Sequence, residues 1–134
     1  MKLELNVKQF EKLIKYYYEK YENINCKIIT NPKIEYTGYY DDKTCTVEII
    51  QIITKKLLDE EVELKKYLNL EDLKKILGIV LLEENMEVLE INFDCGIRYD
   101  NYDLHNNNEV EYFYFNGVNL KVNEIKNKVK EKRW

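Results

Sequence analysis

The sequence predicts an α+β domain in which an antiparallel sheet of about six to seven strands packs against two helices. Two segments place apolar residues at helical spacing, and segments rich in β-branched and aromatic residues lie between and after them. The predicted order is helix, four strands, helix and three strands. No linker, internal repeat or low-complexity block interrupts residues 1–134, so we expect a single domain.

The first helix is predicted from Val7 to about Glu22. Asn6 and Gln9 have the spacing of a capping box, in which each side chain bonds to the backbone of the other residue. Apolar and aromatic residues then recur every three or four positions and form one face of a helix. These residues are Phe10, Leu13, Ile14, Tyr17 and Tyr21.

Two predicted features follow this helix, a short strand and a long hairpin. The strand covers Cys26–Thr30 and is bounded by Asn31-Pro32, since Pro32 disfavours a helix and suits a turn or a strand edge. Segments Lys33–Tyr40 and Lys43–Lys56 then form the hairpin, with the Asp41-Asp42 pair in its turn.

Residues 57–68 fit neither the helical nor the strand spacing well. Alternation from Val62 onward favours a fourth strand after a turn at Asp59-Glu60-Glu61. A helical extension is the alternative interpretation. It would run directly into the next helix and leave a smaller sheet.

Asn69 and Asp72 predict the N-terminus of a second helix, which ends at Glu84-Asn85. Its apolar face is broad, so we expect it to be the most buried helix. Gly78 lies in its middle, where glycine costs about 1 kcal/mol relative to alanine. We interpret this glycine as permitting close packing. The apolar face consists of Leu70, Leu73, Ile76, Leu77, Val80 and Leu81.

The last third of the chain predicts a strand from Val88 to Phe93 and a loop over Asp94–Asn108. Asn116-Gly117 then indicates a tight hairpin, since this pair accepts the positive φ angles of a type I′ turn. We expect this hairpin to support the preceding loop. Residues Asn123–Trp134 fit either a short final helix capped by Asn123 or a frayed tail.

The formal net charge of −4 conceals a segregation of charge along the chain. Residues 83–111 carry nine acids against Arg98 alone, a balance of −8, whereas residues 112–134 carry six bases against two acids, a balance of +4. We interpret the Lys-rich end as a solvated face, because the domain as a whole is acidic. Direct binding to nucleic acid is therefore not expected.

Cysteine usage and hydropathy favour a reducing compartment. The three cysteines are far apart and form no Cys-x-x-Cys pair, which argues against a disulfide framework and a thiolate zinc site. We expect Cys26, Cys45 and Cys95 to be small core residues. The chain begins without an apolar signal segment, and the apolar run after Gly78 covers only Ile79–Leu82. A cytoplasmic protein without a membrane span is the expectation.

Catalytic side chains are sparse. The sequence has no serine and one histidine, which excludes a serine nucleophile and a multi-histidine metal site. One group of ligands could bind a divalent cation, as a metal-dependent nuclease requires. It consists of Asp94, Asp100, Asp103 and His105. The nuclease is the alternative hypothesis, and the expectation is a non-enzymatic protein without cofactor or metal.

The remaining positive feature is a surface dense in acids and tyrosines. Carboxylates can imitate phosphates and occupy a basic nucleic-acid channel, while tyrosine rings supply contact area at low entropic cost. The predicted contact residues are Asp59, Glu60, Glu61 and Glu63 in one turn and Tyr99, Asp100, Tyr102 and Asp103 in the loop.

In style, the chain resembles small proteins of low-GC Gram-positive bacteria and their phages. The similar stretches are the Lys/Tyr-rich first helix, the Tyr-rich hairpin, Asn-Leu-Glu-Asp-Leu-Lys-Lys-Ile-Leu (69–77) and Tyr-Phe-Asn-Gly-Val (114–118). That group includes anti-CRISPR and other counter-defence inhibitors, which are typically small acidic binders. The resemblance implies an inhibitor of a host protein or ribonucleoprotein complex that handles nucleic acid, such as a CRISPR effector. A homodimer or larger homo-oligomer that pairs through an exposed hairpin edge is the third hypothesis.

Overall fold

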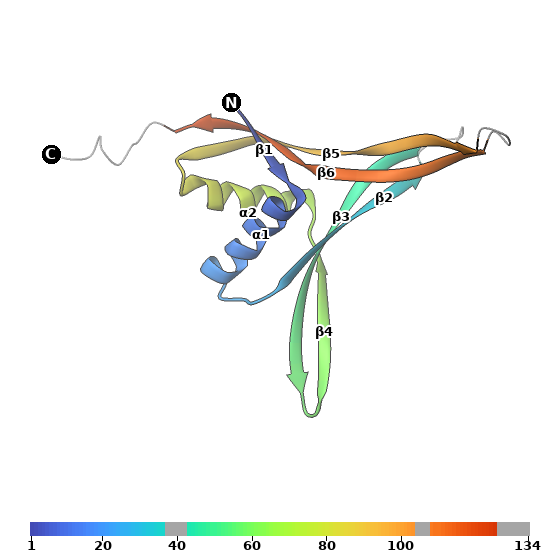
Figure 1. Cartoon of the computed structure of the whole chain (residues 1–134). Coiled ribbons are helices and arrows are strands. Elements are labelled where there is room, and N and C mark those ends of the chain that lie inside the picture. The colour runs from blue at the N-terminus through green and yellow to red at the C-terminus, as the bar shows by residue number, and fades with distance from the viewer. Residues whose placement is uncertain (37–42, 104–107, 126–134) are drawn as a thin grey trace.

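The computed structural model describes residues 1–36, 43–103 and 108–125, and its architecture is α+β. Six antiparallel strands form two three-stranded sheets, and the two helices lie beneath the first sheet (Figure 1). The fold class is confirmed, although the strands divide between two sheets instead of one. The elements in chain order are β1 (Lys2–Asn6), α1 (Val7–Tyr21), β2 (Lys27–Tyr36), β3 (Lys43–Leu57), β4 (Glu60–Tyr67), α2 (Leu70–Leu82), β5 (Met86–Asp103) and β6 (Asn108–Glu124).

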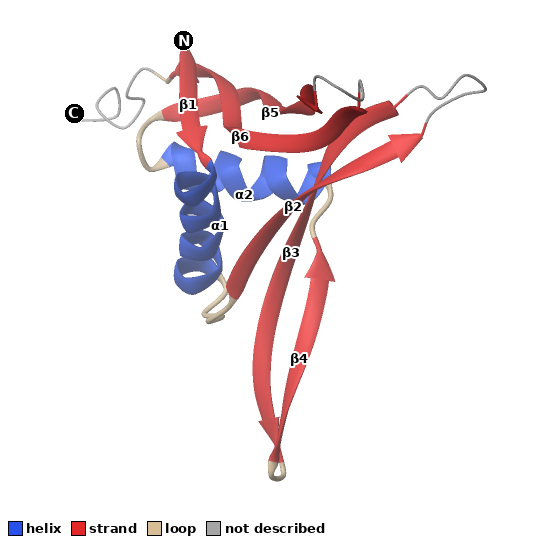
Figure 2. Ribbon diagram, turned by 45° about the vertical axis from the view of Figure 1, so that its right-hand side comes forward, coloured by secondary structure: helices blue, strands red, loops and turns tan. Residues whose placement is uncertain are grey.

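The first sheet has the strand order β1-β6-β5, and the second has the order β2-β3-β4. β6 is central in the first sheet because it pairs with β1 on one side and β5 on the other. β3 is central in the second sheet, and its last residues continue past β2 to pair with β4 alone. Figure 2 shows that this end of β3 and β4 points away from the helices.

Both helices begin with the predicted capping interactions. Asn6 Oδ1 accepts a hydrogen bond from the Gln9 backbone N–H at 2.8 Å, and Asn6 N–H donates to Gln9 Oε1 at 2.9 Å. Asn69 and Asp72 form the same reciprocal pair at the start of α2, with distances of 2.8 and 2.9 Å. Each pair satisfies backbone N–H groups that the first turn leaves without a helical partner.

The hydrophobic core lies between the helices and the first sheet, and it continues onto the base of the second sheet. The ring of Phe10 on α1 meets Phe93 on β5 edge to face, with ring centroids 6.1 Å apart. Ile28 and Ile49 extend the core onto β2 and β3. Neither described helix is long and apolar enough to cross a membrane. The fully buried side chains include Phe10, Ile14, Leu77, Val118, Leu120 and Val122.

The predicted strand break at Asn31-Pro32 is wrong, because β2 continues through both residues and Pro32 pairs in register with Val47. β2 is an edge strand, and an edge strand tolerates proline where the missing N–H faces away from its neighbour. The predicted Asp41-Asp42 turn lies outside the described residues. The preferred strand interpretation of residues 57–68 is confirmed. Its predicted turn at Asp59-Glu60-Glu61 is misplaced, because the turn is Leu58-Asp59 and β4 already begins at Glu60.

The predicted loop over Asp94–Asn108 is wrong as far as Asp103, because β5 continues to that residue. The predicted hairpin at Asn116-Gly117 is also wrong. Both residues lie inside β6, where Gly117 is the register partner of Asn6 in β1 and of Asp94 in β5.

Both ends of the described chain form strands where the sequence did not predict them. β1, which the sequence did not predict, occupies Lys2–Asn6 and provides the edge of the first sheet. The predicted helix cap at Asn123 is wrong, because β6 continues to Glu124. The rest of the predicted final helix, residues 126–134, lies outside the described residues.

Candidate functional site: the arm

A β-ribbon projects from the body of the protein (Figures 1 and 2). We call residues 53–67 the arm; it comprises the end of β3, the Leu58-Asp59 turn and all of β4. Its strands pair in continuous register from Leu57 opposite Glu60 to Ile53 opposite Leu64 and beyond. All residues from 54 to 61 are exposed, so the end of the ribbon has water on both faces.

Leu58 occupies the turn at the end of the arm. Its side chain is 99% exposed, and its backbone has a φ of 57°, in the left-handed region that glycine and asparagine adopt most readily. A leucine here buries no apolar surface within the described chain and costs about 1–2 kcal/mol in backbone strain. Leu58 is not among the contact residues predicted from the sequence. A leucine set among acids in a turn is the signal that could have revealed it.

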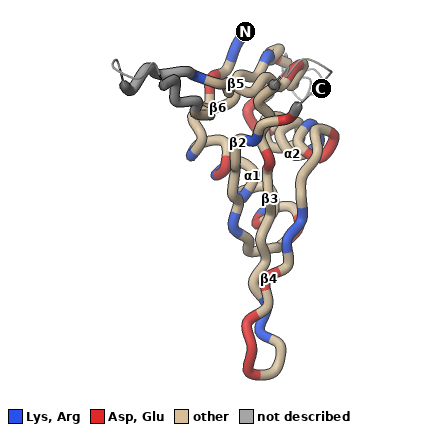
Figure 3. Tube along the Cα trace, turned by 90° about the vertical axis from the view of Figure 1, so that its right-hand side faces the viewer, with Lys and Arg blue, Asp and Glu red and all other residues tan. Residues whose placement is uncertain are grey.

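Of the four acids predicted in one turn, Asp59 lies in the turn beside Leu58, whereas the other three follow along β4. Figure 3 shows acidic residues at the end of the arm and lysines nearer the body of the protein. We call residues 58–63 the tip. We call the rest of the arm, residues 53–57 and 64–67, the stem. All four acids carry no hydrogen bond or ion pair among the described residues, so their oxygens remain open to a partner. They are Asp59, Glu60, Glu61 and Glu63.

The arm as a whole is neutral, although its tip is acidic. Four lysines on the stem balance the four acids of the tip. Lys56 is the register partner of Glu61, so these opposite charges lie on facing strands, although the two side chains form no ion pair. The acidic field is therefore confined to the tip. The lysines are Lys55, Lys56, Lys65 and Lys66.

The two faces of the arm differ in polarity, because side chains alternate along each strand. One face carries Leu57, Val62, Leu64 and Ile53, and the first and third of these are 59% and 46% exposed. The opposite face is mostly polar. Val62 and Leu64 alternate with polar residues in the sequence, as in a strand with one buried face, but neither described helix lies against the arm (Figure 2).

The second group of predicted contact residues lies elsewhere, near the end of β5. The backbones of Tyr99 and Asp100 pair with Glu111 and Val110 of β6, so these residues belong to a strand instead of a loop. The other two members are Tyr102 and Asp103. This end of the first sheet is remote from the tip in Figures 1 and 2, so the two predicted groups do not form one surface.

The ligand set of the nuclease hypothesis is dispersed by the same strand. Asp94 and Asp100 are six residues apart in β5, which corresponds to about 20 Å of extended chain. His105 lies outside the described residues. Within the described ranges, no three acids, cysteines or histidines are grouped to hold a metal ion.

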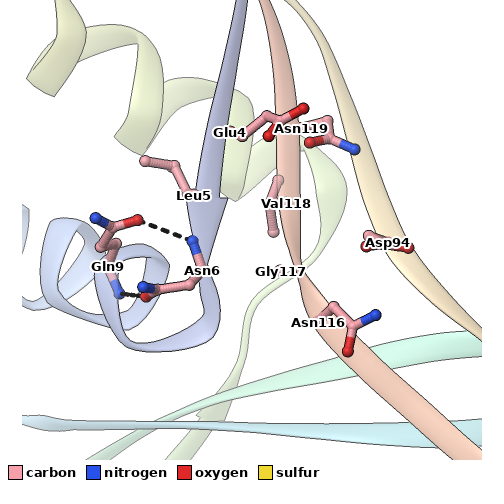
Figure 4. Close-up of a pocket in the computed structure, with 9 residues that line it drawn as sticks. All are labelled: Glu4, Leu5, Asn6, Gln9, Asp94, Asn116, Gly117, Val118 and Asn119. Atoms are coloured by element: carbon pink, nitrogen blue, oxygen red, sulfur yellow. Dashed lines mark hydrogen bonds between the residues drawn. The ribbon is translucent and has the colours of Figure 1, made fainter.

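A polar pocket of about 360 Å³ lies where β1 meets β6 (Figure 4). The carboxylates of Glu4 and Asp94 and the amide of Asn119 line it. The amides of Asn6 and Gln9 also reach it, but both are engaged in the cap of α1. The cap uses only the two side-chain amide oxygens, so the NH2 groups of Asn6 and Gln9 stay available as donors beside the two carboxylates.

A second cavity, of about 520 Å³, separates the two sheets and contains two of the three cysteines. The Cys95 thiol donates to the backbone carbonyl of Cys45 at 3.4 Å. Burial, together with the Cys45 thiol, raises the pKa of Cys95 to about 11. Cys26 is buried, whereas Cys45 and Cys95 are only partly buried, so the core expectation holds fully for Cys26 alone. A protonated Cys95 is a poor nucleophile.

No protein-family model, no curated protein and no solved structure matches this chain. Each functional role proposed below therefore rests on the residues and geometry of the chain itself.

Proposed function

We propose that this protein is a non-enzymatic binding protein, a phage-type inhibitor of a host nucleic-acid-handling complex such as a CRISPR effector, and that the tip of the arm enters its basic channel. The exposed, strained leucine at the tip carries the proposal. Stability alone favours glycine or asparagine at a positive φ, and Leu58 recovers no burial in return. A partner surface that takes up this side chain supplies the missing burial.

The acids of the tip determine the kind of partner that it binds. Four carboxylates within six residues present closely spaced negative charge, as a nucleic-acid backbone does. A two-stranded ribbon, whose strands lie about 5 Å apart, is narrow enough to enter a groove that holds a nucleic-acid strand. The acids steer the tip towards basic residues, and Leu58 fills an apolar pocket among them.

The cellular setting of the proposal is a reducing cytoplasm. All three cysteines are free thiols. Free thiols persist where glutathione and thioredoxin keep cysteines reduced.

The test is an affinity purification from a low-GC Gram-positive host, coupled to a phage-protection assay. The tip variant combines Leu58→Gly with Asp59→Lys; both positions lie in the turn, outside β4. We expect the wild type to retain a nuclease or ribonucleoprotein and to protect phage, and the tip variant to do neither. The matched control is Glu71→Lys, which makes the same type of charge change on the exposed start of α2.

The second predicted group is tested separately with Asp100→Lys and Asp103→Lys. We expect these changes to weaken capture less than the tip variant does, because the two groups lie on different parts of the fold. Capture of no nuclease or ribonucleoprotein by the wild type would overturn the proposal. So would equal loss of capture with Glu71→Lys.

A further inference from the structure

β4 has a free edge, and no third described strand pairs with the arm. β4 pairs with β3, and no other described strand occupies its opposite edge. Pairing between β2 and β3 ends at Lys27 opposite Ile52, so the arm beyond this point is only two strands wide. A two-stranded ribbon alone in water is marginally stable, and a third strand or an apolar cover is normally needed.

The charges of β4 are arranged in two opposite halves. The strand reads Glu-Glu-Val-Glu-Leu-Lys-Lys-Tyr from residue 60 to residue 67, with acids before Leu64 and bases after it. A strand with this pattern repels a parallel copy of itself and attracts an antiparallel one. We propose that β4 pairs antiparallel with β4 of a second copy of this chain, and that the resulting homodimer contains a continuous β3-β4-β4-β3 sheet.

The pattern selects one register, centred on Glu63. In this register Glu60 lies opposite Lys66 and Glu61 lies opposite Lys65, and the two-fold symmetry of the dimer makes each pair twice. Val62 lies opposite Leu64, so the apolar residues also meet. Opposite charges and apolar pairs on facing strands each contribute about 0.2–1 kcal/mol. The one unfavourable pair is Glu63 with its own copy at the centre.

The backbone supports the same register. A two-residue turn is closed by a hydrogen-bonded pair, here Leu57 and Glu60, and hydrogen-bonded pairs then alternate along an antiparallel ribbon. The peptide groups of Glu61, Glu63 and Lys65 therefore point away from β3. Centring on Glu63 sets these three residues opposite one another, so each outward N–H finds a carbonyl of the second copy.

Charges on an edge strand commonly prevent pairing with other chains. In β4 they oppose most partners but not a second antiparallel β4, because acids and bases occupy opposite halves. Pairing also joins the Val62 and Leu64 side chains of both copies into one apolar stripe on the same face as Leu57 and Ile53. The second copy thus pairs with the free edge, places opposite charges on facing positions and extends the exposed apolar face.

The test uses two charge variants of the full chain in analytical ultracentrifugation over a concentration series. One is Glu60→Lys with Glu61→Lys, which makes all four charged pair positions basic; the other is Lys65→Glu with Lys66→Glu, which makes them acidic. We expect the wild type to dimerise and each variant alone to dissociate about tenfold or more readily, since four favourable pairs become repulsive. An equimolar mixture restores every pair, so we expect a heterodimer of wild-type affinity.

The control is Lys74→Glu with Lys75→Glu, the same change in charge on the exposed side of α2, which should leave the dimer intact. Glu63→Gln removes the one repulsive pair and should tighten it. A wild type that is monomeric at the highest soluble concentration would overturn the proposal. A mixture that fails to form the heterodimer, with both variants folded by circular dichroism, would also overturn it. In the dimer, Glu60 and Glu61 face lysines of the second copy, so the dimer and the channel-bound arm are alternative states of this ribbon. The tip variant used for partner capture leaves β4 unchanged, so the two proposals fail independently.

Discussion

Gly117 of β6 lies so close to β1 that a Cβ atom on residue 117 would overlap the backbone carbonyl oxygen of Leu5. The same Cβ would also stand 3.0 Å from Asn6 Cα. The φ of Gly117 is +150°, a conformation that side chains of L-residues rarely adopt. Glycine at this position therefore allows β1 to pair with β6 just before α1 begins.

Gly117→Ala should be strongly destabilising. The backbone conformation alone costs about 1–3 kcal/mol for a residue with a side chain, and the overlap with Leu5 adds about 1–3 kcal/mol of overpacking. We expect a loss of about 3 kcal/mol or more in the free energy of unfolding, measured by urea denaturation. A loss below about 1 kcal/mol would contradict the close approach of the two strands.

Gly78→Ala is the matched control. No described atom beyond the backbone of α2 lies within 4 Å of the position that its Cβ would take, so our interpretation of Gly78 as a close-packing residue is wrong. Alanine in a helix interior is about 0.5–1 kcal/mol more favourable than glycine. The variant should therefore raise the urea midpoint, in contrast to Gly117→Ala.

The helices were predicted from the sequence more accurately than the strands, for a physical reason. Capping boxes and apolar spacing act within a few residues, so Asn6 and Asn69 locate both helix starts from sequence. The Asn116-Gly117 pair misleads because its turn preference is also local, while its actual role depends on β1, more than a hundred residues away. Long-range pairing overrides a local turn preference.

The candidate site was predictable only in part. A turn with exposed acids follows from Asp59, Glu60 and Glu61. The projection of the arm does not follow, because Val62 and Leu64 alternate with polar residues as they would in a strand covered by a helix. Whether another element covers a strand depends on the packing of the whole chain.

Glu83 links the end of α2 to α1 through hydrogen bonds. Its replacement should change how the stability of the fold depends on pH. Its Oε1 accepts hydrogen bonds from the Lys20 ammonium, from Tyr16 Oη at 3.0 Å and from Tyr21 Oη at 2.9 Å. The bond from Lys20, followed by the two tyrosine bonds, holds the pKa of Glu83 below its ordinary value of 4.5. A carboxyl with a lowered pKa stabilises the fold above pH 4.5, and this contribution is lost as the pH falls through the lowered value.

Glu83→Gln should therefore lower the urea midpoint at neutral pH, and the difference from the wild type should shrink as the pH falls below 4.5. Glu84→Gln is the control, because Glu84 is exposed and makes no side-chain hydrogen bond or ion pair in the part of the chain described. A Glu83→Gln difference that is constant with pH would show that the carboxylate charge does not matter.

Cys95 should react slowly with alkylating reagents. A thiol with a pKa of about 11 instead of 9.0 has about 100-fold less thiolate at neutral pH, and the thiolate is the reactive species. We expect iodoacetamide labelling of Cys95, followed by peptide mass spectrometry, to rise steeply only towards pH 11. Cys45→Ala removes a neighbour that raises this pKa and should shift the labelling profile to lower pH. An unchanged profile would mean that the two thiols do not interact.

Two substitutions at Leu58 measure how the backbone strain and the exposed side chain of this residue affect stability. Leu58→Gly should raise the free energy of unfolding by about 1 kcal/mol, because glycine adopts the positive φ without strain. Leu58→Ala keeps a Cβ and thus the strain, and it removes a side chain that is 99% exposed, so it should leave the stability within about 0.5 kcal/mol of the wild type. Urea denaturation at low protein concentration measures both. If Leu58→Ala instead cost about 2–5 kcal/mol, as a buried leucine does, the tip would be packed against the protein itself. With the expected result, the leucine lowers the stability of the free protein, which favours the proposed contact of Leu58 with a partner.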